Sequence, residues 1–268
     1  MTSTIDFALN IRKNSLRMVH RAKASHIASA LSICDIIAVL YGKVMYFDID
    51  NDRSYKRDRF ILSKGHACVA LYSALREINF ISDAEIHSFG DNFSLLMNHI
   101  SHKVRGVEFS TGSLGHGLPF AVGKAVAAKI NNLTWKVFVL LSDGEMDEGS
   151  NWEALIYSAH HKLDNLTIII DYNKLQSLDT VANTLNLEPL TEKIESFGCC
   201  VLNIDGHNHD EIFSALATVA IKKPKVIIAH TIKGKGVSFM ENKVIWHYKN
   251  PNDVELELAL KELDYSNA

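Results

Sequence analysis

The chain has 268 residues, of which 47% are hydrophobic, and a formal net charge of −3 with Lys and Arg scattered among Asp and Glu. This length and composition suffice for one large α/β domain or two small ones with a buried core. Without a basic stripe or a run of ~20 apolar residues, we expect no nucleic-acid partner, no membrane contact and a cytoplasmic location.

The four cysteines are expected to be reduced thiols. None is spaced as Cys-x-x-Cys, and Cys199 and Cys200 are adjacent in an expected strand, so their side chains should point to opposite faces.

The N-terminal third carries histidines at places where strands or turns lead into helices. Residues 5–23 have the spacing of an amphipathic helix, residues 24–32 form a small-residue turn containing His26, and residues 33–41 are again helical. Any one such histidine is most simply an ordinary turn residue. Its recurrence at equivalent positions favours a site.

A second histidine turn follows a short apolar strand at residues 57–62. The strand leads through a glycine turn to His66, and a helix follows through Leu71, Leu75 and Ile78. A helix N-terminus at the end of a strand favours anions. Residues 95–102, with His99 and His102, read as an irregular loop.

The densest glycine cluster, residues 106–117, opens a small-residue helix at residues 118–130. Glycines allow backbone groups to face a flat ring or a phosphate. The order Gly-x-x-Gly-x-Gly matches neither the dinucleotide fingerprint nor a P-loop. Close helix packing explains the cluster equally well.

Two buried strands in the middle of the chain end in polar residues. Residues 137–141 lead into Ser142-Asp143-Gly144-Glu145, and residues 166–170 lead into Asp171-Tyr172-Asn173. Between them we predict a helix at 151–161 that is capped by Ser150 and buries Trp152, Leu155, Ile156 and Ala159. A right-handed crossover makes the strands parallel, so Asp143 and Asn173 should meet at the ligand-binding edge of the sheet. Their oxygens suit a small divalent cation that also holds a diphosphate. The simpler interpretation is that Asp143 caps a helix and Asn173 shapes a turn.

The rest of the chain continues the alternation of helices and strands. After a polar loop to residue 186 we expect helices at 190–197 and 209–221, strands at 199–204 and 225–231, a long irregular connection at 233–248, and an amphipathic helix from about residue 251. No repeat or linker is evident. We therefore predict one domain over residues 1–268, with α/β class, a doubly wound and mostly parallel sheet, helices on both faces and a helical N-terminal extension.

Seven collinear segments carry a resemblance to a known family. They are Ser25-His26-Ile27, Ser-Lys-Gly-His at 63–66, Gly-Val-Glu-Phe-Ser-Thr-Gly-Ser-Leu-Gly-His-Gly at 106–117, Ser-Asp-Gly-Glu-x-x-Glu-Gly at 142–149, Asp-Tyr-Asn-x-Leu-Gln at 171–176, Asp-Gly-His at 205–207, and Thr-Ile-Lys-Gly-Lys-Gly-Val-Ser-Phe-Met-Glu-Asn at 231–242 with Trp-His after it. Over nearly its full length the chain resembles the N-terminal third of transketolase, and in particular the small subunit of two-gene transketolases. The resemblance implies a thiamine diphosphate-binding fold of the diphosphate-binding type.

The resemblance also implies site residues. Those implied to bind the cofactor and its metal are Asp143, Asn173 and the carbonyl of Leu175 on Mg²⁺ (or Ca²⁺ or Mn²⁺), His66, Gly144 and His247 around the cofactor, and Gly112 and Leu114 near its aminopyrimidine. Those implied to surround the hydroxyls and carbonyl of the sugar are His26, His66, His99 and His247, with His102 as an alternative to His99. Histidine suits proton movement near neutral pH.

The implied reaction transfers a two-carbon ketol unit from a ketose, or its phosphate, to an aldose. The aminopyrimidine-binding domain of this family lies beyond this chain, so the resemblance implies a separate C-terminal subunit, an α2β2 assembly and Glu148 facing a neighbouring subunit. The alternatives are the α subunit of a 2-oxo acid dehydrogenase E1, which shares the metal site, and a non-catalytic scaffold.

Three segments depart from the family pattern. Ser142 replaces the first glycine of Gly-Asp-Gly, Ser25-His26-Ile27 replaces Gly-His-Pro, and His116 replaces a glutamine. The first leaves the implied metal ligands in place and supports the scaffold alternative. The other two lie near the implied cofactor or substrate and leave the sugar preference open.

Overall fold

The computed structural model describes residues 3–51 and 54–265, and its centre is a five-stranded parallel sheet. The strands, in the spatial order β1-β2-β3-β5-β4, are β1 Arg59–Leu62, β2 Val137–Ser142, β3 Leu166–Tyr172, β5 Lys225–His230 and β4 Cys200–Asp205. Each neighbouring pair is parallel, so all five carboxyl ends lie at the same edge. The predicted fold class is confirmed.

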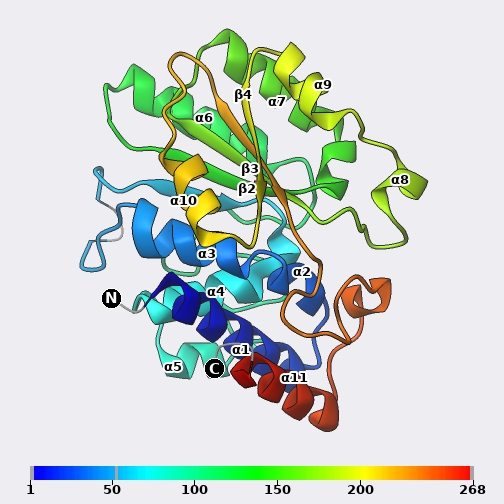
Figure 1. The fold of residues 1–268 in the computed structure, drawn as a ribbon. Helices are drawn as coiled ribbons and strands as arrows, with labels where there is room; N and C mark the ends of the chain where they lie inside the picture. Colours follow the sequence, from blue (N-terminus) through cyan, green and yellow to red (C-terminus); the bar gives the residue numbers. More distant parts are fainter. Residues whose placement is uncertain (1–2, 52–53, 266–268) are drawn as a thin grey trace.

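Alternate strand residues build two apolar cores, one on each face of the sheet. One row across the sheet faces the first core and consists of Ile61, Val139, Ile168, Val226 and Val201. Helices α6 Gly117–Ile130, α7 Gly149–His160 and α9 Leu190–Ser196 cover this face (Figure 1). Because successive side chains in a strand point to opposite faces, the intervening residues, such as Phe138 and Leu140, enter the second core.

The second core contains the N-terminal helices and extends through two layers (Figure 1). Helices α2 Ile27–Leu31, α3 Cys34–Val39, α4 Cys68–Glu77 and α10 His209–Ala217 contribute to it. Helix α1, Thr4–Ala22, begins and ends close to the predicted bounds and packs against α4 and against the terminal helix α11, Asp253–Tyr265.

Several local predictions were wrong. Helix α7 begins at Gly149, so Ser150 lies inside the helix, where its hydroxyl donates to the Gly115 carbonyl at 2.6 Å instead of capping. Ile156 is 51% exposed and does not belong to the buried face. The turn predicted at 24–32 contains α2, because Ile27 and its small neighbours are buried against the core.

The remaining differences are short elements without a sequence period. The helix predicted at 33–41 ends as α3 and continues as a π-helical turn, Leu40–Val44. Helix α8, Val181–Thr184, lies in the segment predicted as a polar loop, and helix α5, Asp83–His87, lies in a segment for which the sequence gives no prediction. Turns of 3₁₀ type occupy Gly65–Ala67, Gly144–Asp147 and Val244–His247.

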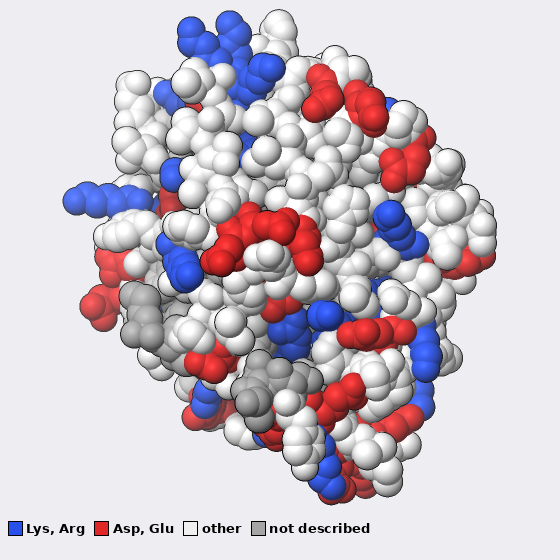
Figure 2. Space-filling model, in the orientation of Figure 1, with Lys and Arg blue, Asp and Glu red and all other residues white. Residues whose placement is uncertain are grey.

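Surface and thiol features follow the sequence closely. In the described part of the chain, no helix is long and apolar enough to cross a membrane. All four cysteines are free, and only Cys200 is not fully buried. On the face drawn in Figure 2, basic and acidic side chains are interspersed.

Candidate active site

All ten residues predicted from the sequence line one cavity of about 240 Å³ at the carboxyl ends of the strands. They are His26, His66, His99, Gly112, Leu114, Asp143, Gly144, Asn173, Leu175 and His247. Parallel strands bring these segments together because the loops that leave the strands emerge at one edge of the sheet.

Asp143 begins the turn that follows β2 and is 2% exposed. Its carboxylate accepts hydrogen bonds from the backbone N–H groups of Gly144 at 2.8 Å and Lys174 at 2.6 Å. Burial, and next the nearby Asp171 carboxylate, raise the pKa of Asp143 to about 6. A bound cation would offset this cost by favouring the charged form.

Two further oxygen atoms stand in the loop after β3. The Asn173 amide donates to Asp171 at 3.1 Å, which directs Nδ2 to that carboxylate and leaves Oδ1 as the acceptor for the Leu175 N–H, also at 3.1 Å. The Leu175 carbonyl accepts from the ammonium of Lys233 at 2.7 Å.

The chemistry of these donors fits a hard divalent cation. Among the residues that the structure describes, no group of three or more His, Cys, Asp or Glu side chains could hold a metal. Asp143, Asn173 and the Leu175 carbonyl form a different kind of set, with one carboxylate and two neutral oxygens. Such a set fits Mg²⁺ when a phosphate ligand supplies further oxygens.

Two buried lysines that sequence reasoning missed also line the cavity. Lys64 lies 2.5 Å from Asp171, and these side chains are 1% and 0% exposed. Lys233 is 2% exposed, and burial, followed by the charge of Lys64, lowers its pKa to about 8. Both lysines belong to segments that carried the family resemblance, Ser-Lys-Gly-His and Thr-Ile-Lys-Gly, so the signal was present in the sequence.

Four imidazoles form a cluster with His26 at its centre. The His26 ring centroid lies 4.7 Å from that of His247, 5.2 Å from that of His66 and 5.9 Å from that of His99. Its backbone N–H donates to the His247 carbonyl at 2.9 Å, which joins the first histidine turn to the last. His26 itself has φ 71°, an uncommon conformation for a residue other than glycine.

Burial keeps these imidazoles neutral at pH 7. It is the largest cause lowering the pKa of His26 to about 4 and of His247 to about 3, and the pKa values of His66 and His99 are lowered as well. The Nδ1 atoms of His26 and His247 are buried without a hydrogen-bond partner. Buried polar atoms are usually paired, so these two indicate a ligand.

The structure separates the two candidates for the third histidine. His99 lines the cavity, and its ring is 3.1 Å from the position that a Cβ on Gly112 would take. His102 is exposed and bonds to the Ser110 hydroxyl at 2.7 Å.

Two of the departures from the family pattern, Ser142 and His116, make local hydrogen bonds. The Ser142 hydroxyl accepts from the Glu145 N–H at 3.2 Å and so closes the turn that carries Asp143. His116 is exposed and bonds to the carbonyl of Leu114 at 3.0 Å. Glu148 is exposed beside the same turn.

Glu145 is a further residue that sequence reasoning missed. It is 0% exposed, and burial raises its pKa. Its carboxylate accepts from the Gly115 N–H at 3.0 Å, from the Ser63 hydroxyl and from the Ser142 N–H at 3.4 Å. It thereby joins three loops that line the cavity. Glu145 lies behind these loops and does not line the cavity itself.

Comparison with known protein families gives a match over nearly the whole chain. Residues 4–266 match the family described as the transketolase, thiamine diphosphate-binding domain. The chain is 40% identical over 254 residues to one of the subunits of apulose-4-phosphate transketolase from Phocaeicola vulgatus, covering 94% of this chain and 90% of that protein. It is 38% identical to the SqwG subunit of 6-deoxy-6-sulfo-D-fructose transketolase from a Clostridium species, covering 96% and 95%.

Single-chain transketolases match over only part of their length. Human transketolase is 36% identical over 245 residues, which is 91% of this chain but 39% of the human protein. A crystal structure of transketolase from Campylobacter jejuni superposes with a TM-score of 0.92 at 30% identity, over 98% of this chain and 43% of that one. The chain therefore spans less than half the length of these relatives.

Proposed function

Because the chain belongs to the transketolase, thiamine diphosphate-binding domain family, we propose that it is the diphosphate-binding subunit of a two-chain transketolase. The enzyme would transfer a two-carbon ketol unit from a ketose, or its phosphate, to an aldose or its phosphate. The observation that carries this proposal is the single cavity lined by an oxygen donor set, two lysines and four histidines.

The metal and cofactor residues follow from the donor chemistry. Asp143, Asn173 and the Leu175 carbonyl would hold Mg²⁺, and Lys64, Lys233, His66 and the Gly144 backbone would face the diphosphate. Gly112 and Leu114 would lie near the aminopyrimidine. Thiamine diphosphate, when bound, supplies the electron sink that ketol transfer needs. The protein's own residues orient it and exclude water around it.

The histidine cluster would bind and move protons on the sugar. Neutral imidazoles can both accept a hydrogen bond from a hydroxyl and donate one to a carbonyl. The unpaired Nδ1 atoms of His26 and His247 supply two such positions. His66 and His99 flank them and would hold the remaining donor hydroxyls.

A separate subunit would complete the site. The relatives whose names mark them as one subunit of a transketolase match this chain over about their whole length, whereas single-chain transketolases continue well beyond the match.

Exposed apolar side chains also stand one or two residues along the chain from cavity residues. These are Met97 at 60% exposure, Leu178 at 79%, Ile245 at 58% and Tyr248 at 53%. We call them the apolar rim, and it would contact the pyrimidine-binding domain of the partner in an α2β2 assembly.

The test is reconstitution with the partner chain. We expect ketol transfer to require both chains, Mg²⁺ and thiamine diphosphate, and calorimetry to detect cofactor binding only when both chains are present. Full activity of this chain alone would contradict the two-chain proposal. Release of carbon dioxide from pyruvate or a branched 2-oxo acid would identify a 2-oxo acid dehydrogenase instead, and neither heat nor activity would identify a scaffold.

The donor sugar can be sought among the substrates of the relatives. Their names refer to apulose 4-phosphate and 6-deoxy-6-sulfo-D-fructose. A panel of these ketoses with xylulose 5-phosphate and fructose 6-phosphate, ranked by kcat/KM, would distinguish a pentose phosphate enzyme from one dedicated to an unusual sugar.

A further inference from the structure

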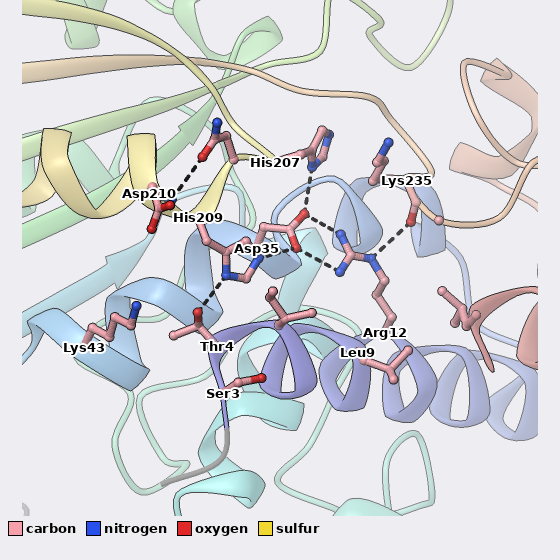
Figure 3. Close-up of a pocket in the computed structure, with 14 residues that line it drawn as sticks. Ser3, Thr4, Leu9, Arg12, Asp35, Lys43, His207, His209, Asp210 and Lys235 are labelled. Carbon is pink, nitrogen blue, oxygen red and sulfur yellow. Dashed lines mark hydrogen bonds and ion pairs between the residues drawn. The ribbon is translucent and has the colours of Figure 1, made fainter. Parts of the chain in front are cut away.

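A buried carboxylate outside the active-site cavity gathers an unusual number of donors. Asp35 on α3 is 5% exposed and borders a separate cavity of about 630 Å³ (Figure 3). It accepts two hydrogen bonds from Arg12, at 3.0 and 2.5 Å, one from His207 at 2.8 Å and one from His209 at 3.1 Å. The Asp-Gly-His segment that contains His207 does not line the active-site cavity.

His207 connects Asp35 to the loop after β5. The Ile232 N–H donates to its Nε2 atom at 2.8 Å, so the ring proton must be on Nδ1, where it can be donated to Asp35. Arg12 connects the same carboxylate to the same loop, because its Nε donates to the Lys235 carbonyl at 3.3 Å. We call Arg12, Asp35 and His207 the Asp35 anchor.

The anchor therefore holds both ends of a four-residue segment, and the lysine between those ends reaches the active site. Lys233 donates to the carbonyls of Leu175 at 2.7 Å and Gln176 at 2.9 Å, and it lines the cavity. Because Lys233 is 2% exposed, its side chain is packed against its surroundings, and a displaced backbone would displace the ammonium.

Two glycines allow the segment to pass this close. Gly206 donates to the His230 carbonyl at 2.8 Å, and a Cβ there would stand 2.4 Å from Thr231. Gly234 has φ +86° and donates to the Ala28 carbonyl at 3.0 Å, and its Cβ would stand 2.6 Å from the Met240 carbonyl oxygen. Two residues of the Asp-Gly-His segment therefore have a structural role. Gly206 lets the end of β5 approach closely, and His207 bonds to Asp35 and to the Ile232 N–H.

We propose that the Asp35 anchor positions Lys233 for the diphosphate of the cofactor. Arg12, Asp35 and His207 lie outside the active-site cavity and act through the backbone of residues 232–235. They are positioning residues, not catalytic ones. The inference rests on the proposed function for the identity of the cofactor, whereas the anchoring of the loop stands on the hydrogen bonds alone.

The chain offers a matched pair of histidines for the test. His207 and His209 both bond to Asp35, but the second ring nitrogen of His209 bonds to the Thr4 hydroxyl at 2.8 Å and not to the loop. In His207→Asn the amide can still donate to Asp35, but the acceptor for Ile232 is lost. In His207→Gln the amide oxygen can reach the position of Nε2 and restore that acceptor. His209→Asn is the control, because its amide can keep the bond to Thr4 and loses the bond to Asp35, so it perturbs the carboxylate without removing a contact to the loop.

The experiment measures two quantities with both subunits present. The first is hydrogen exchange at residues 232–237, and the second is the Kd of thiamine diphosphate with Mg²⁺ by calorimetry. We expect His207→Asn to accelerate the exchange and to raise Kd by about tenfold or more. This is the size of one charge-assisted contact, here the contact between the Lys233 ammonium and the diphosphate. His207→Gln should recover most of the difference, and His209→Asn should leave both quantities within about twofold of wild type.

A double-mutant cycle tests whether Lys233 transmits the effect. In a Lys233→Met background, His207→Asn should raise Kd no further. Equal effects of His207→Asn and His209→Asn, or full additivity with Lys233→Met, would overturn the inference. If the wild-type pair binds no thiamine diphosphate, the proposed function fails. The exchange comparison then decides the anchoring by itself, and unchanged exchange in His207→Asn would refute it.

Discussion

At the scale of single residues, the site is defined by charged side chains that are buried away from water. Asp143 carries a pKa raised to about 6, while its neighbour Asp171 has a lowered pKa, although burial opposes it, because Lys64 lies against it. The pKa values differ because, among the residues that the structure describes, Asp171 has a lysine as an ion-pair partner and Asp143 does not. Asp143 is therefore the carboxylate whose partner must come from outside.

Asp143→Asn should affect the stability of the chain and its affinity for the cofactor differently. The neutral amide removes a buried charge but turns an NH2 donor toward one of the two backbone N–H groups that now donate to the carboxylate, so the free energy of unfolding of the isolated chain should change by no more than about 1 kcal/mol. The Mg²⁺-dependent affinity for thiamine diphosphate in the two-chain complex should fall by more than about tenfold. Urea unfolding and calorimetry measure the two quantities.

Asp147→Asn is the matched control for that substitution, because Asp147 is exposed in the same turn and, among the described residues, its side chain accepts one hydrogen bond, from Gln176. It should leave the cofactor affinity as in wild type. Unchanged affinity in Asp143→Asn would contradict the assignment of Asp143 as a metal ligand.

The neutral histidines predict a pH dependence of stability. Their folded pKa values lie below the ordinary value of 6.5, so the unfolded chain binds more protons as the pH falls. Their contribution to stability is complete above pH 6.5 and is lost progressively toward pH 4 for His26 and pH 3 for His247. For the partly solvated His26 we expect a loss of about 1–2 kcal/mol.

Urea unfolding of wild type and His26→Gln between pH 7.5 and 4.5 isolates this contribution. The difference between the two curves cancels the opposite contribution of Asp143, whose raised pKa favours the folded state as the pH falls. The variant should lose less stability on acidification, whereas His102→Gln, outside the cavity, should follow wild type. Parallel curves for His26→Gln and wild type would show that His26 is not held neutral by the fold.

At the scale of elements, the carboxyl ends of β1, β2, β3 and β5 and the loops that follow them carry most of the site. The strands themselves are rigid, so the position of each loop is set by a few close contacts. One such contact lies in the loop after β5, at Gly234, where the backbone of Met240 leaves no room for a side chain.

Gly234→Ala should destabilise this loop. Positive φ and the contact with the Met240 carbonyl oxygen both oppose a methyl group, so we expect a loss of about 1–3 kcal/mol in the free energy of unfolding. Gly123→Ala in α6 is the counterpart, because no atom lies within 4 Å of its added Cβ, and it should stabilise the chain by about 0.5–1 kcal/mol. Thermal unfolding of the two variants should move in opposite directions, and movement in the same direction would contradict this account of the loop.

The elements also show which features a sequence can predict. The strands were found because β-branched runs buried on both faces end in polar residues, and the shared edge of Asp143 and Asn173 follows from the parallel order of the strands. Helix α2 was missed because its small residues have no amphipathic period, and the Ser150 cap was wrong because its hydroxyl bonds to Gly115, a partner far away in the sequence. Lys64, Lys233 and Glu145 were missed for the same reason, since their partners belong to other loops.

At the scale of the whole molecule, four exposed apolar side chains neighbour cavity residues along the chain. Met97, Leu178, Ile245 and Tyr248 come from three separate loops, and each stands one or two residues from a residue that lines the cavity. Large exposed apolar groups at the border of a binding site indicate a protein interface.

Charged substitutions in the apolar rim should separate association from folding. Leu178→Glu and Ile245→Glu should weaken the binding of the partner chain by about tenfold or more each, while the melting temperature of the isolated chain stays within about 1 °C. Val219→Glu is the control, because Val219 is 81% exposed and precedes β5, at the opposite edge of the sheet. Analytical ultracentrifugation of the mixed chains measures the effect, and association equal to wild type would place the interface elsewhere.

The Asp35 anchor affects the order in which tertiary contacts can form while the chain is synthesised on the ribosome. Arg12 and Asp35 are synthesised early, but His207 and the loop that they hold emerge almost two hundred residues later, and α11, which packs on α1, is later still. During vectorial synthesis α1 can pack against α3 and α4 first, but the Asp35 anchor and the contact with α11 can form only after residues 207–265 have left the ribosome.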